Sequence, residues 1–221
     1  MDHRIVGRAV FAFALAASVP SLPATTISFN FGGQSCGSAG SCTAVPGATT
    51  ISFDSLTVST PSPYTQGLLT YTWTGSQSPF VQGSVSGQYA APVGDTTTFL
   101  TIGTANKPAT VTLSFSKPVY YFGFYMGSPD SYNSISFYDN TTLIRSFTGD
   151  QLINPGNGDQ SISDYLNFYV SGGAITQIVM SSSKAAFETD SHSYAGMPEP
   201  ATWGALGLGL GLLALRARRR Q

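Results

Sequence analysis

The sequence predicts an all-β fold for its central part, an antiparallel β-sandwich of jelly-roll-like form. Short runs in which apolar and polar residues alternate follow one another at near-even spacing, and such alternation turns one face of each strand toward a core. Gly, Pro, Asn and Ser separate these runs, as they do in tight turns. No interior stretch repeats apolar residues at helical spacing. Many short strands joined by turns are typical of a sandwich.

The expected strands follow from the alternation, taken in chain order. In the first of them, Ile27, Phe29 and Phe31 share one face. The run 119–126 is apolar and aromatic almost throughout, which indicates a strand covered on both sides. Turn-forming residues at 139–142 predict a hairpin between the two runs that flank them. The expected strands are 26–31, 50–58, 68–73, 98–102, 110–115, 119–126, 134–138, 143–147, 165–170, 175–180 and 185–187.

The first 24 residues have the pattern of a secretory signal peptide. Arg4 and Arg8 precede an apolar stretch, residues 9–19, and prolines then break any helix before a cleavage site that follows Ala24. The apolar stretch is too short to span a bilayer comfortably, so removal is favoured over retention. The remainder of the chain is therefore expected outside the cytoplasm, with residues 25–196 forming one domain.

The charge of this domain excludes nucleic acid as a partner. Between residues 25 and 197 there are nine Asp and Glu side chains and four Lys and Arg side chains, so the net charge is −5. Binding to phosphates requires a basic surface. Abundant Ser, Thr, Gly and aromatic residues with few Lys and Glu are typical of an extracellular β-protein.

Cys36 and Cys42 lie in a Gly- and Ser-rich segment with five residues between them. In an oxidising compartment such a pair is expected to form a local disulfide. A metal site is the alternative, but no further Cys or His lies nearby in the sequence.

The sequence offers little for catalysis, and we expect no enzymatic activity and no required cofactor. His192 is the one histidine of the domain, and no Gly-x-Ser-x-Gly elbow precedes a helix. We expect its side chain to be solvated near the C-terminal edge of the domain. Glu188 is the one glutamate of the domain, and most of the aspartates occupy turns.

Two binding hypotheses remain open. Asp54, Glu188 and Asp190 would supply oxygen ligands to a structural calcium ion if the early and late strands pair. Exposed aromatic rings would stack on sugars, although aromatic residues equally suit a sandwich core. The candidate stacking residues are Trp73, Tyr121, Tyr125 and Tyr132.

The C-terminal segment, residues 197–221, has the pattern of a sorting and anchoring signal. Pro198, Glu199 and Pro200 precede an apolar stretch at 201–215. Fifteen residues of helix would extend about 22 Å, which is less than a hydrocarbon core of about 30 Å. We therefore expect a single, temporary transmembrane helix with the basic tail 216–221 in the cytoplasm. The tail arginines are Arg216, Arg218, Arg219 and Arg220.

This combination resembles the PEP-CTERM signal of exosortase-dependent bacterial surface proteins. Residues 121–133 are similar to the FGFYxGSPDSYN pattern of one subgroup, and residues 187–190 resemble the closing strand of that subgroup. The resemblance implies export by the Sec machinery, transient retention in the inner membrane and recognition by exosortase at Pro-Glu-Pro. It also implies release or transfer to the cell surface, often alongside exopolysaccharide or biofilm matrix.

Two functional hypotheses follow. The first is a non-enzymatic surface or extracellular-matrix protein associated with exopolysaccharide. The second is a carbohydrate-binding module that uses exposed aromatic rings, with or without a structural calcium ion.

Overall fold

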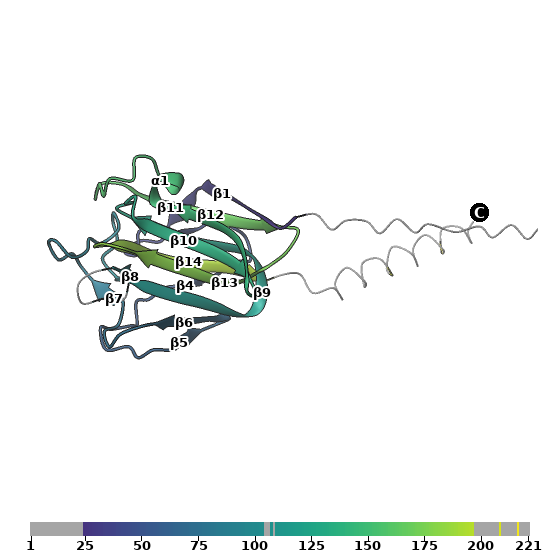
Figure 1. Ribbon diagram of the computed structural model, residues 1–221, viewed down its shortest axis with the longest axis horizontal. Coiled ribbons are helices and arrows are strands. Elements are labelled where there is room, and N and C mark those ends of the chain that lie inside the picture. The colour runs from purple at the N-terminus through teal and green to yellow at the C-terminus, as the bar shows by residue number, and fades with distance from the viewer. Residues whose placement is uncertain (1–23, 104–106, 108, 197–207, 209–215, 217–221) are drawn as a thin grey trace, which may run out of the picture.

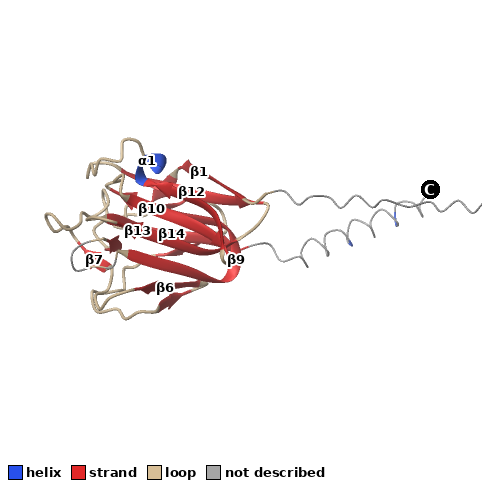
Figure 2. Ribbon diagram, in the orientation of Figure 1, coloured by secondary structure: helices blue, strands red, loops and turns tan. Residues whose placement is uncertain are grey.

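The computed structural model describes residues 24–103, 107, 109–196, 208 and 216 (Figure 1). Strands make up most of this part, and α1 (Gly149–Leu152) is a single helical turn (Figure 2). The strands pair antiparallel throughout the main sheet. The prediction of an all-β, antiparallel fold is therefore confirmed.

Strands that lie far apart in sequence pair in two groups. One group has the order β11-β10-β13-β9-β6-β5, and the other has the order β1-β12-β9-β14-β8-β7, with β4 also on β14. A separate two-stranded sheet joins β2 to β3. The bounds are β1 Thr26–Phe31, β2 Gly33–Ser35, β3 Ser41–Thr43, β4 Thr49–Ile51, β5 Tyr64–Gln66, β6 Leu69–Trp73, β7 Phe80–Gln82, β8 Thr98–Ile102, β9 Thr110–Gly127, β10 Asn133–Asp139, β11 Thr142–Thr148, β12 Ser163–Ser171, β13 Ile175–Ser182 and β14 Phe187–Gly196.

The long strand β9 belongs to both groups. Its first part pairs with β6 and β13, whereas its second part pairs with β12 and β14. The sequence predicted two strands here, 110–115 and 119–126, but the structure has one continuous strand. Pro118, which has no N–H to donate, is exposed where β9 passes from one set of partners to the other, so it interrupts no buried ladder.

The two groups face each other across the core. Ring centroids of Phe137 and Phe168, from β10 and β12, lie 4.8 Å apart, and those of Phe29 and Phe147, from β1 and β11, lie 5.3 Å apart. None of these strand pairs is hydrogen-bonded, so the contacts are made between layers. This arrangement is that of a β-sandwich.

Two sequence predictions need correction at strand boundaries. The expected strand 50–58 ends at Ile51, and the chain then turns. The expected strand 185–187 is instead β14, a ten-residue strand in which the first nine residues are buried. Its sequence after Phe187 is largely polar, and polar runs lack the alternation by which strands are recognised. The predicted hairpin is confirmed as β10 and β11.

Several predicted segments lie outside the described residues. These are the signal peptide, apart from Ala24, the Pro-Glu-Pro motif, the predicted transmembrane helix 201–215, apart from Leu208, and the tail arginines other than Arg216, which is exposed. In the part of the chain that the structure describes, no helix has the length and apolar character needed to cross a membrane.

Phe168 lies between the two layers, stacked on Phe124 with 5.8 Å between ring centroids. We predict that Phe168→Ala lowers the free energy of unfolding by about 3–5 kcal/mol, because it leaves a cavity that neighbouring rings cannot fill. Phe31→Ala is the control, since half of that side chain is exposed, and it should cost less than about 1 kcal/mol. Urea denaturation of both variants measures the difference, and equal losses would contradict this view of the core.

Candidate functional site

A polar cavity of about 500 Å³ opens at the end of the sandwich where β9 ends and β10 and β14 begin. Four segments line it, and two of them carry the sequence patterns that stood out at 121–133 and 187–190. The lining residues are Ser84, Val85, Ser86, Gly87, Gln88, Tyr89, Ala90, Ser128, Asp130, Tyr132, Asn157, Gly158, Gln160, Ala185, Ala186 and Glu188.

Main-chain hydrogen bonds fix the loop between β9 and β10 against residues 149–158. The N–H of Ser131 donates to the carbonyl of Gly156 at 2.9 Å, and the N–H of Gly158 donates to the carbonyl of Pro129 at 2.8 Å. Gly158 has a φ of +73°, and a Cβ there would meet the Asp130 carboxylate. A glycine at this position therefore lets the two segments approach closely.

Glu188 joins three segments at the wall of the cavity. Its side chain is 2% exposed. Oε1 accepts a hydrogen bond from the N–H of Ala90 at 2.9 Å, and Oε2 accepts one from Oγ of Ser128 at 2.8 Å. Burial raises the pKa of the Glu188 carboxyl to about 7, and the charge of Asp130 adds to the rise. With both oxygens bonded to protein donors, Glu188 fastens the loops and β14 together.

Asp130 and Tyr132 present polar groups and an aromatic ring to the cavity. Burial raises the pKa of the Asp130 carboxyl, while Tyr132 and Lys184 act in the opposite direction. The Tyr132 hydroxyl donates to the carbonyl of Ala185 at 2.6 Å, and Lys184 Nζ lies 5.4 Å from the centroid of the ring. These contacts hold the ring in one orientation.

A second acidic group lies two residues further along β14. Asp190 is fully buried, and neither carboxylate oxygen has a hydrogen-bond partner. Its carboxyl neighbours that of Asp95, and the two carboxyls act on each other's pKa. Burial raises the pKa of Asp190 to about 8, and the negative charge of Asp95 adds to the rise. The N–H of Ser191, the next residue in the chain, acts in the opposite direction on this pKa.

Asp95 comes from the connection between β7 and β8, residues 83–97. Its side chain is 5% exposed. Oδ1 accepts hydrogen bonds from the N–H and from Oγ1 of Thr97, both at 2.8 Å, whereas Oδ2 has no partner. Burial raises the pKa of this carboxyl as well.

A bulge in β14 separates this polar face from the core. The register with β9 shifts between Asp190 and Ser193, and Ser191 has a φ of +49°. Such a bulge re-aims the side chains that follow it. As a result Thr189 and His192 both face the core, where Nε2 of His192 lies 2.9 Å from Oγ1 of Thr189.

The expectation that His192 is solvated is wrong. Its side chain is fully buried, and Nδ1 lies 3.1 Å from the hydroxyl of Tyr71. The ring of Phe53 packs edge-on at 5.0 Å between centroids. Burial lowers the pKa of His192 to about 3, so the neutral ring is a packing and hydrogen-bonding element of the core.

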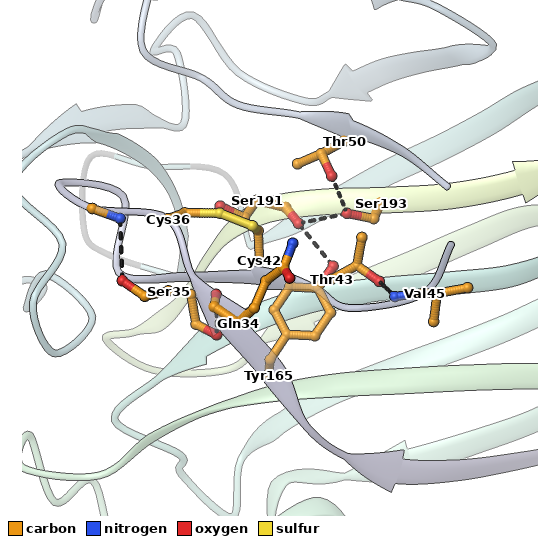
Figure 3. Close-up of a disulfide and its surroundings, with 12 residues drawn as sticks. Gln34, Ser35, Cys36, Cys42, Thr43, Val45, Thr50, Tyr165, Ser191 and Ser193 are labelled. Carbon is orange, nitrogen blue, oxygen red and sulfur yellow. Dashed lines mark hydrogen bonds between the residues drawn. A yellow bond between two sulfur atoms is a disulfide. The ribbon is translucent and has the colours of Figure 1, made fainter. Parts of the chain in front are cut away.

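Cys36 and Cys42 form a disulfide between β2 and β3. Figure 3 shows the bridge beside Tyr165 and Ser191, over the outer face of β14 and β12. The Tyr165 hydroxyl donates to the carbonyl of Ser191 at 3.0 Å. The bridged loop therefore covers the sheet face from which Asp190 projects.

Two of the four predicted stacking aromatics are buried. Tyr121 is fully buried, with its hydroxyl 2.6 Å from Oγ1 of Thr43, and Tyr125 is 5% exposed. For these two residues the prediction of an exposed ring is wrong, because the β2–β3 hairpin covers them. Trp73 is partly buried at the end of β6 and packs edge-on against Phe80. Tyr132 alone of the four lines the cavity.

The three predicted calcium ligands do not form one group. Among the described residues no set of three or more His, Cys, Asp or Glu side chains is arranged to hold a metal ion. Asp54 is exposed, and its charge reaches Asp190 and Asp95, whereas Glu188 binds Ala90 and Ser128. Asp95 was not predicted from the sequence, because a single aspartate in a Gly- and Thr-rich loop is typical of a turn.

Comparison with known proteins does not place the chain in a family: no family model matches it, and no curated protein matches it.

We predict that Glu188→Ala lowers the free energy of unfolding by about 1–3 kcal/mol, because it leaves buried donors of Ala90 and Ser128 without an acceptor. Asp139→Asn, which changes a partly exposed carboxylate of β10, is the control and should have little effect. Chemical denaturation measures both. Unchanged stability of Glu188→Ala would show that the carboxylate does not fasten these loops.

Proposed function

We propose that the chain is an exported, exosortase-sorted bacterial protein of the cell surface or extracellular matrix. In this proposal it is not an enzyme, and it associates with exopolysaccharide. The N-terminal pattern of residues 1–24 and the tail of residues 197–221 support export and sorting. The Sec machinery would carry the chain across the inner membrane, and exosortase would act at Pro-Glu-Pro.

The observation that carries the proposal furthest is the position of Gly196, the last residue of β14, relative to the cavity. Glu188 lies near the start of β14, and Gly196 ends that strand, roughly 25 Å away at the usual rise per residue. Figure 1 shows the described ends of β1 and β14 at one end of the sandwich, opposite the loops around the cavity. A domain held at its C-terminus would present the cavity away from the membrane.

Two further features support a durable extracellular module. The Cys36–Cys42 disulfide suits an oxidising compartment, and the sandwich would be of the jelly-roll type. A non-enzymatic role also fits the contacts of Glu188 and His192. Protein groups bond both carboxylate oxygens of Glu188 and both ring nitrogens of His192, so neither side chain has an atom left to act on a substrate.

Sorting is tested by the mass of the mature protein in cells with and without exosortase. We predict that the wild-type chain loses both the signal peptide and the tail and leaves the inner membrane. Changing Glu199 to Ala should leave the tail attached and the protein in the membrane fraction, whereas Gln221→Ala should be processed normally. Normal processing of Glu199→Ala, or of the wild type without exosortase, would contradict the proposal.

The cavity favours a second candidate function, carbohydrate binding. It combines the ring of Tyr132 with the carboxylate of Asp130 and with the amides of Asn157 and Gln160. Sugars are bound by rings that stack on their apolar faces and by polar groups that bond their hydroxyls. The binding residues would thus be those of the cavity rather than the aromatic set expected from sequence.

A glycan array with the wild-type chain tests this candidate. We predict binding that Gln160→Ala weakens at least tenfold, because the lost amide bonds cost roughly 1.4 kcal/mol or more. Gln160 is exposed, so the fold should survive its loss. Trp73→Ala, which lies outside the cavity lining, should bind as the wild type does. No binding to any glycan, or equal binding by Gln160→Ala, would exclude the cavity as a sugar site.

A further inference from the structure

The Asp95 and Asp190 carboxyls form a buried pair with unmet bonding capacity. Three of their four oxygens, Oδ2 of Asp95 and both oxygens of Asp190, have no hydrogen-bond partner. The side chains are 5% and 0% exposed, so water does not solvate them freely. Buried polar atoms are nearly always bonded, and three orphaned oxygens at one point call for a ligand.

The surrounding charges increase the need for a positive partner. Asp54 adds a third negative charge that acts on both carboxyls. The positive side chains of the domain lie elsewhere: Lys107 donates to a main-chain carbonyl, Arg145 and Lys184 lie over aromatic rings, and Lys117 is exposed. Burying unpaired carboxylates is costly, so a compensating charge is expected at this point.

A shared proton compensates only part of this pair. One proton makes one O–H···O bond between the two carboxyls, which engages one oxygen of each. The second oxygen of Asp190 would remain without a partner in a site from which solvent is excluded. A cation bound by both oxygens of Asp190 and by Oδ2 of Asp95 would engage all three.

We propose that Asp95 and Asp190 bind a calcium ion beneath the disulfide-bridged loop. Calcium accepts carboxylate oxygens singly or in pairs, and main-chain carbonyls and water complete its coordination. The loop lies against this point, since Ala39 pairs with Asp95 and the N–H of Thr96 donates to the carbonyl of Ser38 at 2.8 Å. The site differs from the one expected from sequence, because it keeps only Asp190 of the three expected ligands, leaves out Asp54 and Glu188, and adds Asp95.

The ion would fasten the connection 83–97 to β14 at a second point. Glu188 already holds this connection at Ala90 through a direct hydrogen bond. Asp190 would hold it at Asp95 through the cation. Because residues 84–90 line the cavity, calcium would steady one wall of the proposed sugar site.

The calcium site depends on the described domain and not on sorting. A negative result in the calcium test therefore leaves the sorting proposal unaffected, and a negative sorting test leaves the calcium site unaffected. The full chain in detergent is freed of divalent cations with a chelator and melted at increasing CaCl₂. We expect one ion per chain by titration calorimetry and a rise in Tm of about 5–10 °C at a calcium concentration of about 100 times Kd. MgCl₂ at the same concentration should give a much smaller rise, because magnesium requires a stricter geometry.

Asp190→Asn and Asp95→Asn should lose the calcium-dependent rise, and Asp139→Asn should keep it. The two variants serve as alternatives if one of them does not fold. The proposal would be overturned if calcium did not raise the Tm of the wild-type chain. It would also be overturned if calcium raised the Tm of both Asp→Asn variants. An equal rise with MgCl₂ would overturn the assignment to calcium.

Discussion

The strand β14 is covered on both faces, and this constrains each of its side chains. On one face Phe187, Thr189 and His192 pack into the sandwich core. On the other face Glu188 and Asp190 lie beneath loops rather than in water. A strand so placed must find a partner for every polar atom, because solvent cannot supply one. The bulge at Ser191 makes this possible, since it lets polar residues alternate between the two environments.

The burial of the two acidic side chains, Glu188 and Asp190, is compensated in different ways. Glu188 receives hydrogen bonds from two loops, and these loops form walls of the cavity. Asp190 meets another carboxyl and no donor, so its ionised form has no protein group to balance its charge. Position along β14 therefore links the stability of the domain to the shape of the cavity. Glu188 fixes the connection 83–97 at Ala90, the proposed calcium ion would fix it at Asp95, and this connection borders the candidate binding site.

Much of the fold could be predicted from sequence because alternation reports a strand with one face in a core. Phe29 and Phe137 obey that rule, and both pack between the layers. β14 could not be predicted in full, because a strand with polar residues on both buried faces has no apolar period. Tyr121 shows a similar limit on predicting binding residues from the sequence. An aromatic residue looks alike in sequence whether its ring meets solvent or lies under a hairpin.

The candidate sites depend on contacts between distant segments. Asp95 and Asp190 are 95 residues apart in the chain, and the pairing of β8 with β14, together with the Ala90–Glu188 hydrogen bond, brings their segments together. Alternation specifies neither that pairing nor the loop that crosses it. The patterns at 121–133 and 187–190 both contribute residues to the cavity wall, but the sequence did not indicate which carboxylates would find hydrogen-bond donors.

The most direct test of whether a cation balances the buried carboxyls of Asp95 and Asp190 is X-ray diffraction at long wavelength from crystals grown with calcium. The proposed calcium site predicts an anomalous peak between the carboxyls of Asp95 and Asp190, at roughly 2.3–2.6 Å from their oxygens. The absence of a peak there, with the two carboxyls bonded to each other or to water, would contradict it.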